Sequence, residues 1–185
     1  DICDKQGILL IFDEVITGWG RTGSPFAAQA FGVTPDIMTM AKAITNGVVP
    51  LGAVASRENI YDTVLDASPM GAEEFFHGYT YSAIPVSMAA GLAMQNIIEK
   101  ENLFQRSKDM SPYFLDGLFS LKDIDVITDI RGYGMLGGID IRFDERAGKA
   151  GYTCFKKLFE AGLSLKATGD CLIVAPPFIC EKEHI

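Results

Sequence analysis

Between Ile8 and Gly47 the sequence places a carboxylate and an amine at the ends of two apolar runs. The first run, Ile8–Phe12, stops at Asp13, and the second, Ile37–Ala41, stops at Lys42. Short apolar runs bounded by glycine-containing turns are typical of buried strands. In an open α/β sheet, functional groups gather at the carboxyl ends of the strands. The acid and the amine are therefore candidates to meet over one ligand.

This pair suits a carbonyl cofactor. A lysine amine that is partly neutral forms Schiff bases with carbonyl compounds, including pyridoxal phosphate (PLP). PLP also needs an anion beside its ring nitrogen to keep that nitrogen protonated. The carboxylate of Asp13 would supply this anion, while Lys42 forms the Schiff base. The alternative is an ordinary salt bridge, or two unrelated solvated charges. The position of each charge directly after an apolar run, with glycines following, favours the cofactor.

The residues around this pair form four motifs: Ile11-Phe12-Asp13-Glu14-Val15, Thr17-Gly18-Trp19-Gly20-Arg21-Thr22-Gly23, Pro35-Asp36-Ile37 and Ala41-Lys42-Ala43-Ile44-Thr45-Asn46-Gly47. In type, order and spacing they resemble the class III PLP-dependent aminotransferases. The resemblance implies that Lys42 is the Schiff-base lysine and Asp13 the partner of the pyridinium nitrogen. It also implies that Val15 packs on one face of the cofactor ring. We further predict that Trp19 contributes to substrate binding.

A second segment, Phe75-Phe76-His77-Gly78-Tyr79-Thr80-Tyr81-Ser82, has composition typical of an aromatic core. It also resembles a segment of the ω-amino-acid transaminases, in which a threonine binds the cofactor phosphate of the neighbouring subunit. The resemblance gives that role to Tyr79 and Thr80. It implies a homodimer, or a dimer of dimers, with shared active sites. The sequence departs from the family just afterwards, where Ala83-Ile84-Pro85 replaces glycine-histidine-proline.

Lys166 stands where many members of this family carry an arginine that binds the α-carboxylate of the amino acceptor. Arginine offers a planar fork to a carboxylate, whereas lysine is a point charge. We predict Lys166 as a substrate-binding residue of lower selectivity. The alternative is a solvated lysine on a turn. The identity of the acceptor therefore stays open.

Alternating strands and helices predict an α/β fold, and the resemblance implies the PLP-dependent transferase fold type I. We expect residues 1–102 to be the later part of a large mixed or parallel-sheet domain. Residues 103–124 would link it to an incomplete α+β C-terminal domain, 125–185. The glycine-rich segment 131–139 does not open a helix as GxGxxG, so we predict tight strands there instead of a nucleotide site.

The periodicity and the turn residues predict the individual elements. Helices are expected at 24–31, with Ser24 as N-cap and Pro25 at N1, and at 57–65, 86–101, 103–121 and 147–161, with Pro112 interrupting the fourth. Strands are expected at 8–12, 37–41, 48–55, 126–130, 135–141 and 171–175.

Composition excludes several other classes. The net charge of −8 argues against non-specific nucleic-acid binding. No apolar run approaches the roughly twenty residues of a membrane span, and residues 1–5 do not form a signal peptide. The four cysteines include no CxxC pair and lie near no histidine cluster, so we expect no metal site. Reduced thiols favour the cytoplasm.

The sequence thus predicts a PLP-dependent aminotransferase. It would move an amino group from an ω-amino acid or primary amine to a keto acid such as pyruvate. Proteins of the resembled family are more than twice as long, so we expect this chain to be part of one. Two alternatives stay open: a class III relative with other PLP chemistry, such as a racemase, mutase or decarboxylase, or a non-catalytic domain or fragment.

Overall fold

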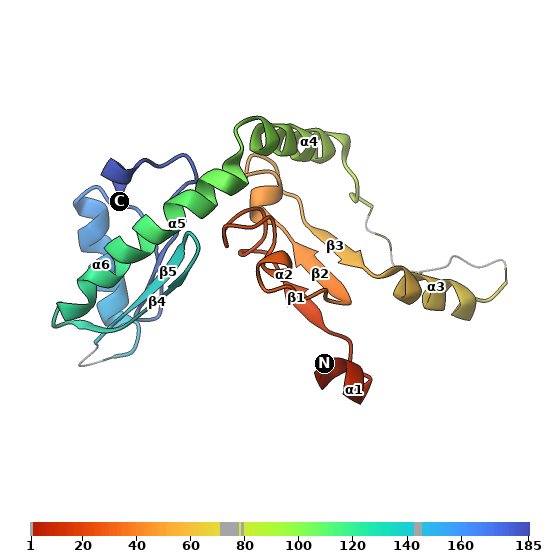
Figure 1. The fold of residues 1–185 in the computed structure, drawn as a ribbon, viewed down its shortest axis with the longest axis horizontal. Helices are drawn as coiled ribbons and strands as arrows, with labels where there is room; N and C mark the ends of the chain where they lie inside the picture. The colour runs from red at the N-terminus through yellow and green to blue at the C-terminus, as the bar shows by residue number, and fades with distance from the viewer. Residues whose placement is uncertain (1, 71–77, 79, 143–145) are drawn as a thin grey trace. The chain divides into compact units, whose positions relative to one another are not determined.

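The computed structural model describes residues 2–70, 78, 80–142 and 146–185 (Figure 1). The chain divides into two compact units. The first contains residues 1–19 and 25–102, and the second contains residues 20–24 and 103–185. Each unit has its own sheet, so we describe each by itself.

The first unit is built on a three-stranded sheet in the order β1-β2-β3. Its strands are β1 (Ile11–Asp13), β2 (Ile37–Met40) and β3 (Ala53–Ser56). β1 and β2 are parallel, whereas β2 and β3 are antiparallel. A parallel pair needs a long crossover connection, and residues 14–36 provide it. The sheet is therefore mixed, as the sequence predicted for this part of the fold.

The first unit also contains helices and a 3₁₀ turn. They are α1 (Ile2–Gln6), α2 (Ala27–Ala30), the 3₁₀ turn η1 (Lys42–Ile44), α3 (Glu58–Ala67) and α4 (Pro85–Lys100). Pro85 occupies the first turn of α4, where its missing N–H costs nothing. α4 packs on η1, so the longest helix of this unit supports the turn that begins at Lys42.

Three predicted boundaries in the first unit are wrong. β1 begins at Ile11 because the backbone of Leu10 instead bonds Asp36, through Leu10 N–H to Asp36 Oδ2 at 2.7 Å. β3 begins at Ala53 because residues 48–52 form a loop after η1. The N-cap of α2 is Phe26, and Ser24 does not cap it, because the first N–H groups of α2 are bound by the carboxylate of Glu14.

The second unit is an antiparallel sheet in the order β4-β5-β7-β6. Its strands are β4 (Ile127–Tyr133), β5 (Leu136–Ile141), β6 (Lys166–Thr168) and β7 (Cys171–Val174). Its helices are α5 (Leu103–Phe119), α6 (Lys149–Glu160) and the 3₁₀ turns η2 (Ser120–Asp123) and η3 (Lys182–His184). α5 lies along the sheet (Figure 1). It runs through Pro112 without a break, so the predicted interruption of this helix at Pro112 is wrong.

One face of this sheet carries the core of the second unit. Leu118 of α5 packs with Ile139, Ile141 and Leu172 of β5 and β7. Side chains of α6, including Leu158, pack on the same cluster. The predicted glycine-rich strands are present, and their glycines let α5 approach. A Cβ at Gly132 would lie 2.6 Å from Leu115 Cδ2, so a larger side chain there would have to displace Leu115.

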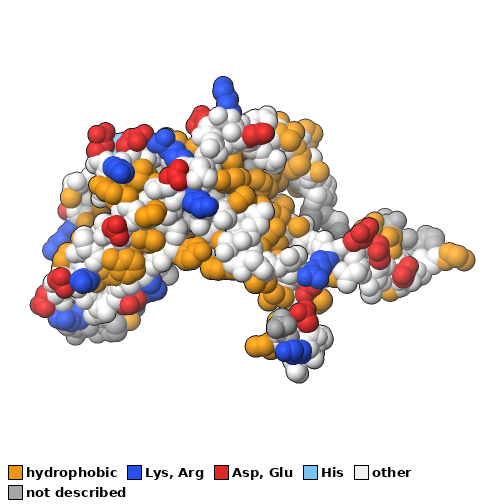
Figure 2. Space-filling view, viewed as in Figure 1, with side chains coloured by type: hydrophobic (Ala, Val, Ile, Leu, Met, Phe, Trp, Pro, Cys, Tyr) orange, Lys and Arg blue, Asp and Glu red, His pale blue; other side chains and the backbone are white. Residues whose placement is uncertain are grey.

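Many apolar side chains remain exposed in the first unit. Figure 2 shows them as hydrophobic surface on the face that it presents. They include Ile8, Leu9, Ile11, Val54 and Leu92. Contiguous exposed apolar surface marks regions that contact other polypeptide.

Candidate active site

Asp13 and Lys42 lie at the same edge of the first sheet. Asp13 ends β1 and pairs with Thr39 of the parallel strand β2. β2 ends at Met40, and Lys42 begins η1 two residues later. Carboxyl ends of neighbouring parallel strands are where open α/β sheets place ligands. The two predicted residues therefore follow adjacent strand ends, and no ion pair joins them within the described residues.

The carboxylate of Asp13 is oriented by its neighbours. Its Oδ1 accepts the N–H of Val15 at 3.0 Å and the hydroxyl of Thr39 at 3.3 Å. No described residue donates a hydrogen bond to Oδ2. One oxygen is thus held by the protein while the other remains available to a ligand.

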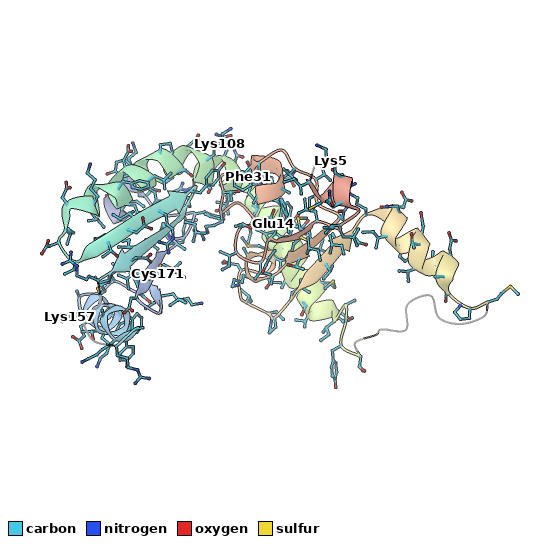
Figure 3. The ribbon with its side chains drawn as sticks, turned by 90° about the horizontal axis from the view of Figure 1, so that it is seen from below. Lys5, Glu14, Phe31, Lys108, Lys157 and Cys171 are labelled. Atoms are coloured by element: carbon cyan, nitrogen blue, oxygen red, sulfur yellow. The ribbon has the colours of Figure 1, made fainter. Side chains whose placement is uncertain are left out.

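Glu14 was not singled out from the sequence, and it is the buried charge beside this site. Its side chain is only 1% exposed. Its oxygens accept the N–H groups of Ala27 at 3.0 Å and Ala28 at 2.7 Å, and the hydroxyl of Thr17 at 2.5 Å. Figure 3 shows Glu14 within the first unit. Because it binds both ends of the segment 17–28, Glu14 fixes the loop that follows Asp13.

Lys42 has an unusual backbone. Its φ of +49° lies in the left-handed region, which L-residues other than glycine, asparagine and aspartate rarely adopt. Its carbonyl accepts the N–H groups of Thr45 and Gly47, both at 3.3 Å. Its amine makes no hydrogen bond or ion pair with any residue that the structure describes. Strained backbone that persists in a fold clusters at functional sites.

A pocket of about 500 Å³ opens beside this turn. Lys42, Thr45, Val49, Pro50 and Leu51 contribute to its mainly apolar walls. Binding sites for small molecules are concave and mostly apolar with a few polar groups. A primary amine in such a wall is the group that a carbonyl ligand requires.

Trp19 lies in the loop after Asp13 and also has a positive φ, +62°. Its ring meets Phe26 edge to face, with centroids 5.4 Å apart. The indole N–H is buried and has no partner within the described part of the chain. Val15 is half-buried and its N–H contacts Asp13. Whether either residue contacts a ligand stays a prediction.

The motif Thr17–Gly23 also has a structural function that the sequence did not reveal. Arg21 donates to the carbonyls of Met135 at 2.9 Å and Pro176 at 2.7 Å, and it stacks on Phe178. Burial lowers the pKa of its guanidinium. Arg21 therefore ties residues 20–24 into the second unit.

The remaining predicted residues are Tyr79, Thr80 and Lys166. Thr80 is exposed, and Tyr79 lies outside the described residues. Lys166 begins the edge strand β6 and is exposed. It pairs with Ile173, which pairs with Gly138, so Lys166 lies on the face opposite the core side chains Ile139 and Leu172.

Arg131 lies on that same face, and it is already committed to carboxylates. It binds both oxygens of Asp140, at 2.7 and 3.1 Å, and Asp129 at 2.6 Å. These hydrogen bonds lower the pKa of the Asp140 carboxyl. Cys171 lies beside this cluster, on β7 (Figure 3). Arg131 therefore does not offer the free guanidinium that a substrate carboxylate would need.

Among the described residues there is no group of three or more histidine, cysteine, aspartate or glutamate side chains that could hold a metal ion. No described helix is both long enough and apolar enough to cross a membrane.

A model of the aminotransferase class-III family matches residues 1–185. The chain belongs to this family. It is 47% identical over 185 residues to an omega-aminotransferase of Caulobacter vibrioides, covering 100% of this chain and 42% of that protein. It is 46% identical over 189 residues to a beta-alanine–pyruvate aminotransferase of Pseudomonas aeruginosa, with the same coverage. The class-III family assignment that the sequence predicted is confirmed.

The fold also matches solved structures of transaminases. A thermostable omega transaminase variant from Pseudomonas jessenii superimposes with a TM-score of 0.91 at 32% identity, over 98% of this chain and 42% of that one. An (S)-enantioselective omega-transaminase from Thermomicrobium roseum gives a TM-score of 0.88 at 35% identity, over 98% and 41%. The predicted fold class is confirmed. This class-III chain spans less than half the length of these relatives.

Proposed function

We propose that the protein containing this chain is a PLP-dependent aminotransferase. It would move the amino group of an ω-amino acid or primary amine to a keto acid such as pyruvate. The observation that carries this proposal is the placement of Asp13 and Lys42 after adjacent parallel strands, with the Lys42 amine unpaired among the described residues. The names of the omega-aminotransferase and beta-alanine–pyruvate aminotransferase relatives support the substrate class.

The residues present fit PLP. The amine of Lys42 would bind the cofactor aldehyde, and Oδ2 of Asp13 would bind the ring nitrogen. Val15, two residues after Asp13, would pack on the ring. When bound, PLP supplies an electron sink that stabilises negative charge at a substrate carbon.

Each of these residues then has a defined task. The Val15 N–H and the Thr39 hydroxyl hold the Asp13 carboxylate in one orientation. A carboxylate beside a basic nitrogen favours its protonated form. Once the substrate amine has replaced it, the freed Nζ of Lys42 would take a proton from the substrate carbon as a general base and then give it up as a general acid.

The cofactor phosphate and the assembly belong to the same proposal. We assign to Tyr79 and Thr80 the binding of the cofactor phosphate in the active site of a neighbouring subunit. The assembly would be a homodimer, or a dimer of dimers, that shares its active sites. A hydroxyl is a suitable donor to phosphate. The exposed apolar residues of the first unit support contact with further polypeptide. Light scattering of the full-length protein tests this, and a monomer would contradict it.

The remaining assignments follow the family pattern. Lys166 and Trp19 are proposed as substrate contacts, and residues 1–102, 103–124 and 125–185 as the later large domain, the link and the C-terminal domain. All four cysteines are free thiols, which supports the cytoplasm as the place of action. A KM for the keto acid that is unchanged in Lys166→Ala would remove Lys166 from this set.

The test is amino transfer by the full-length protein, from β-alanine to pyruvate with added PLP. We expect alanine to form only when a keto acid is present. Product formation without a keto acid would favour a racemase, mutase or decarboxylase. Lys42→Ala should abolish transfer, and Asp13→Asn should lower it by orders of magnitude, about 10² or more. Lys100→Ala, an exposed lysine of the same unit, is the matched control.

A further inference from the structure

The left-handed backbone of Lys42 requires something to hold it. A non-glycine residue at φ +49° is disfavoured relative to the right-handed region, because its Cβ crowds the backbone. Such a conformation persists only where surrounding contacts over-determine it. The direction in which the Lys42 side chain leaves the backbone depends on this conformation. The contacts that maintain it therefore also position the amine.

Thr45 makes the contacts nearest to Lys42. It is 3% exposed, and its N–H donates to the carbonyl of Lys42 at 3.3 Å. Its hydroxyl donates to the carbonyl of Val49 at 2.6 Å. Thr45 thus links the turn at Lys42 to the loop that follows it. Both Thr45 and Val49 also line the pocket beside the amine.

Helix α4 supports the same loop from outside. Ser87, 5% exposed in the first turn of α4, donates its hydroxyl to the carbonyl of Pro50 at 3.1 Å. One turn later, Gly91 lies against the loop and the turn. A Cβ there would be 3.5 Å from Leu51 Cδ2 and 3.7 Å from the carbonyl of Ile44. The helix is therefore in direct contact with the segment that follows Lys42.

We propose that Thr45 is a positioning residue for Lys42, and that Ser87 supports it through the loop 49–51. This inference rests on the proposed function, since it concerns the amine that would bind PLP. Removing the Thr45 hydroxyl leaves the carbonyl of Val49, a half-buried residue, without this donor. The loop then shifts toward another donor, the restraint on Lys42 weakens, and its backbone relaxes toward the right-handed region. The amine moves away from the place where a carbonyl cofactor meets it.

The experiment compares variants of the full-length protein from which PLP has been removed. Thr45→Val keeps the shape and removes the hydroxyl, whereas Thr45→Ser keeps the hydroxyl. Thr63→Val is the matched control, because Thr63 makes the same kind of bond, 2.7 Å to the carbonyl of Asn59, on an exposed helix. The measurements are the Kd for added PLP from cofactor absorbance, the melting temperature, and the lysine trapped by borohydride.

We expect Thr45→Val to raise the Kd for PLP about tenfold, the worth of about one buried hydrogen bond. Thr45→Ser should stay within about threefold of the wild type, and Thr63→Val should match it. A purely structural function would lower the melting temperature of Thr45→Val and leave the Kd unchanged, which would overturn the proposal. If Thr45→Val does not fold, Ser87→Ala decides in its place, with Ser120→Ala as control. A Kd equal to that of its control would overturn the proposal.

The wild type separates the two proposals. If it traps PLP on Lys42 and Thr45→Val binds PLP equally well, only the positioning function is lost. If the wild type traps no PLP on Lys42, the proposed function is lost, and the positioning function with it.

Discussion

Glu14 connects the sequence to the site at the scale of a single residue. It is a buried carboxylate whose partners are two backbone N–H groups and a hydroxyl. Buried charges are tolerated when hydrogen bonds replace the water that they lose. Here these bonds replace the usual N-cap of α2 and fix the loop after Asp13. The charge next to the proposed catalytic aspartate is therefore structural.

Glu14→Ala should lower the free energy of unfolding by about 2–4 kcal/mol, because it leaves the buried N–H groups of Ala27 and Ala28 without acceptors. Urea unfolding of the variant measures the loss. Glu99→Ala, at an exposed position of α4, should change stability by less than about 0.5 kcal/mol. Equal stability of the two variants would contradict the assigned anchoring function.

At the scale of elements, the glycines of two hairpins differ in how much room they leave for a side chain. Gly134 joins β4 to β5 and Gly169 joins β6 to β7, both with φ +60°. A Cβ at Gly134 would lie 2.5 Å from the carbonyl oxygen of Arg21, whereas nothing lies within 4 Å of one at Gly169. The two positions have the same left-handed backbone, but only Gly169 has room for a Cβ.

Gly169→Ala should therefore cost about 1 kcal/mol, from the left-handed backbone alone. Gly134→Ala should cost more than about 3 kcal/mol, because backbone must move as well. Chemical denaturation of both variants gives the comparison. If Gly134→Ala proved as stable as Gly169→Ala, the close packing of residues 20–24 on this hairpin would be wrong.

Asp170 makes the start of α6 sensitive to acid. The N–H groups of Gly148 and Gly151 donate to its carboxylate at 2.6 and 3.0 Å, and they lower its pKa below the ordinary value. A carboxyl with a lowered folded-state pKa stabilises the fold above its unfolded pKa of about 3.9. That stability is lost as the pH falls through the folded value.

The wild type should accordingly lose stability as the pH falls below about 4. Asp170→Asn should be less stable at neutral pH and show a shallower loss over this window. Melting curves between pH 7 and pH 3 measure both. Identical pH profiles for the two proteins would show that Asp170 does not contribute this linkage.

Some elements could be predicted from the sequence because local signals agree with the fold. Pro85 and the helical period predict α4, and the apolar run before Lys42 predicts β2. Other features depend on contacts distant in sequence. β6 has only three residues, and it forms because β7 pairs with it. Ser24 has the composition of an N-cap, but Glu14 supplies the acceptor.

The same division applies to the candidate site. Asp13 and Lys42 could be predicted because each ends an apolar run within a recognisable motif. Glu14, Thr45 and Ser87 could not, because their importance lies in burial and in the carbonyls and N–H groups that they meet. Their only sequence signal is adjacency: Glu14 follows Asp13, and Thr45 lies one turn beyond Lys42.

At the scale of the whole molecule, this chain spans about 42% of the length of its relatives. Its exposed apolar residues, such as Ile11 and Val54, lie on the unit that carries Asp13 and Lys42. We therefore expect polypeptide outside this chain to complete the active site. The atom that would bind the cofactor, Nζ of Lys42, nevertheless lies within this chain.

Borohydride reduction of the full-length protein with bound PLP, followed by tryptic peptide mapping, tests that claim most directly. Trypsin does not cleave after a modified lysine, so an adduct on Lys42 yields a pyridoxyl-bearing peptide that runs from Thr22 to Arg57. We predict that this peptide is found, and that Lys42→Ala abolishes the adduct. An adduct on another lysine, or none at all, would contradict the account.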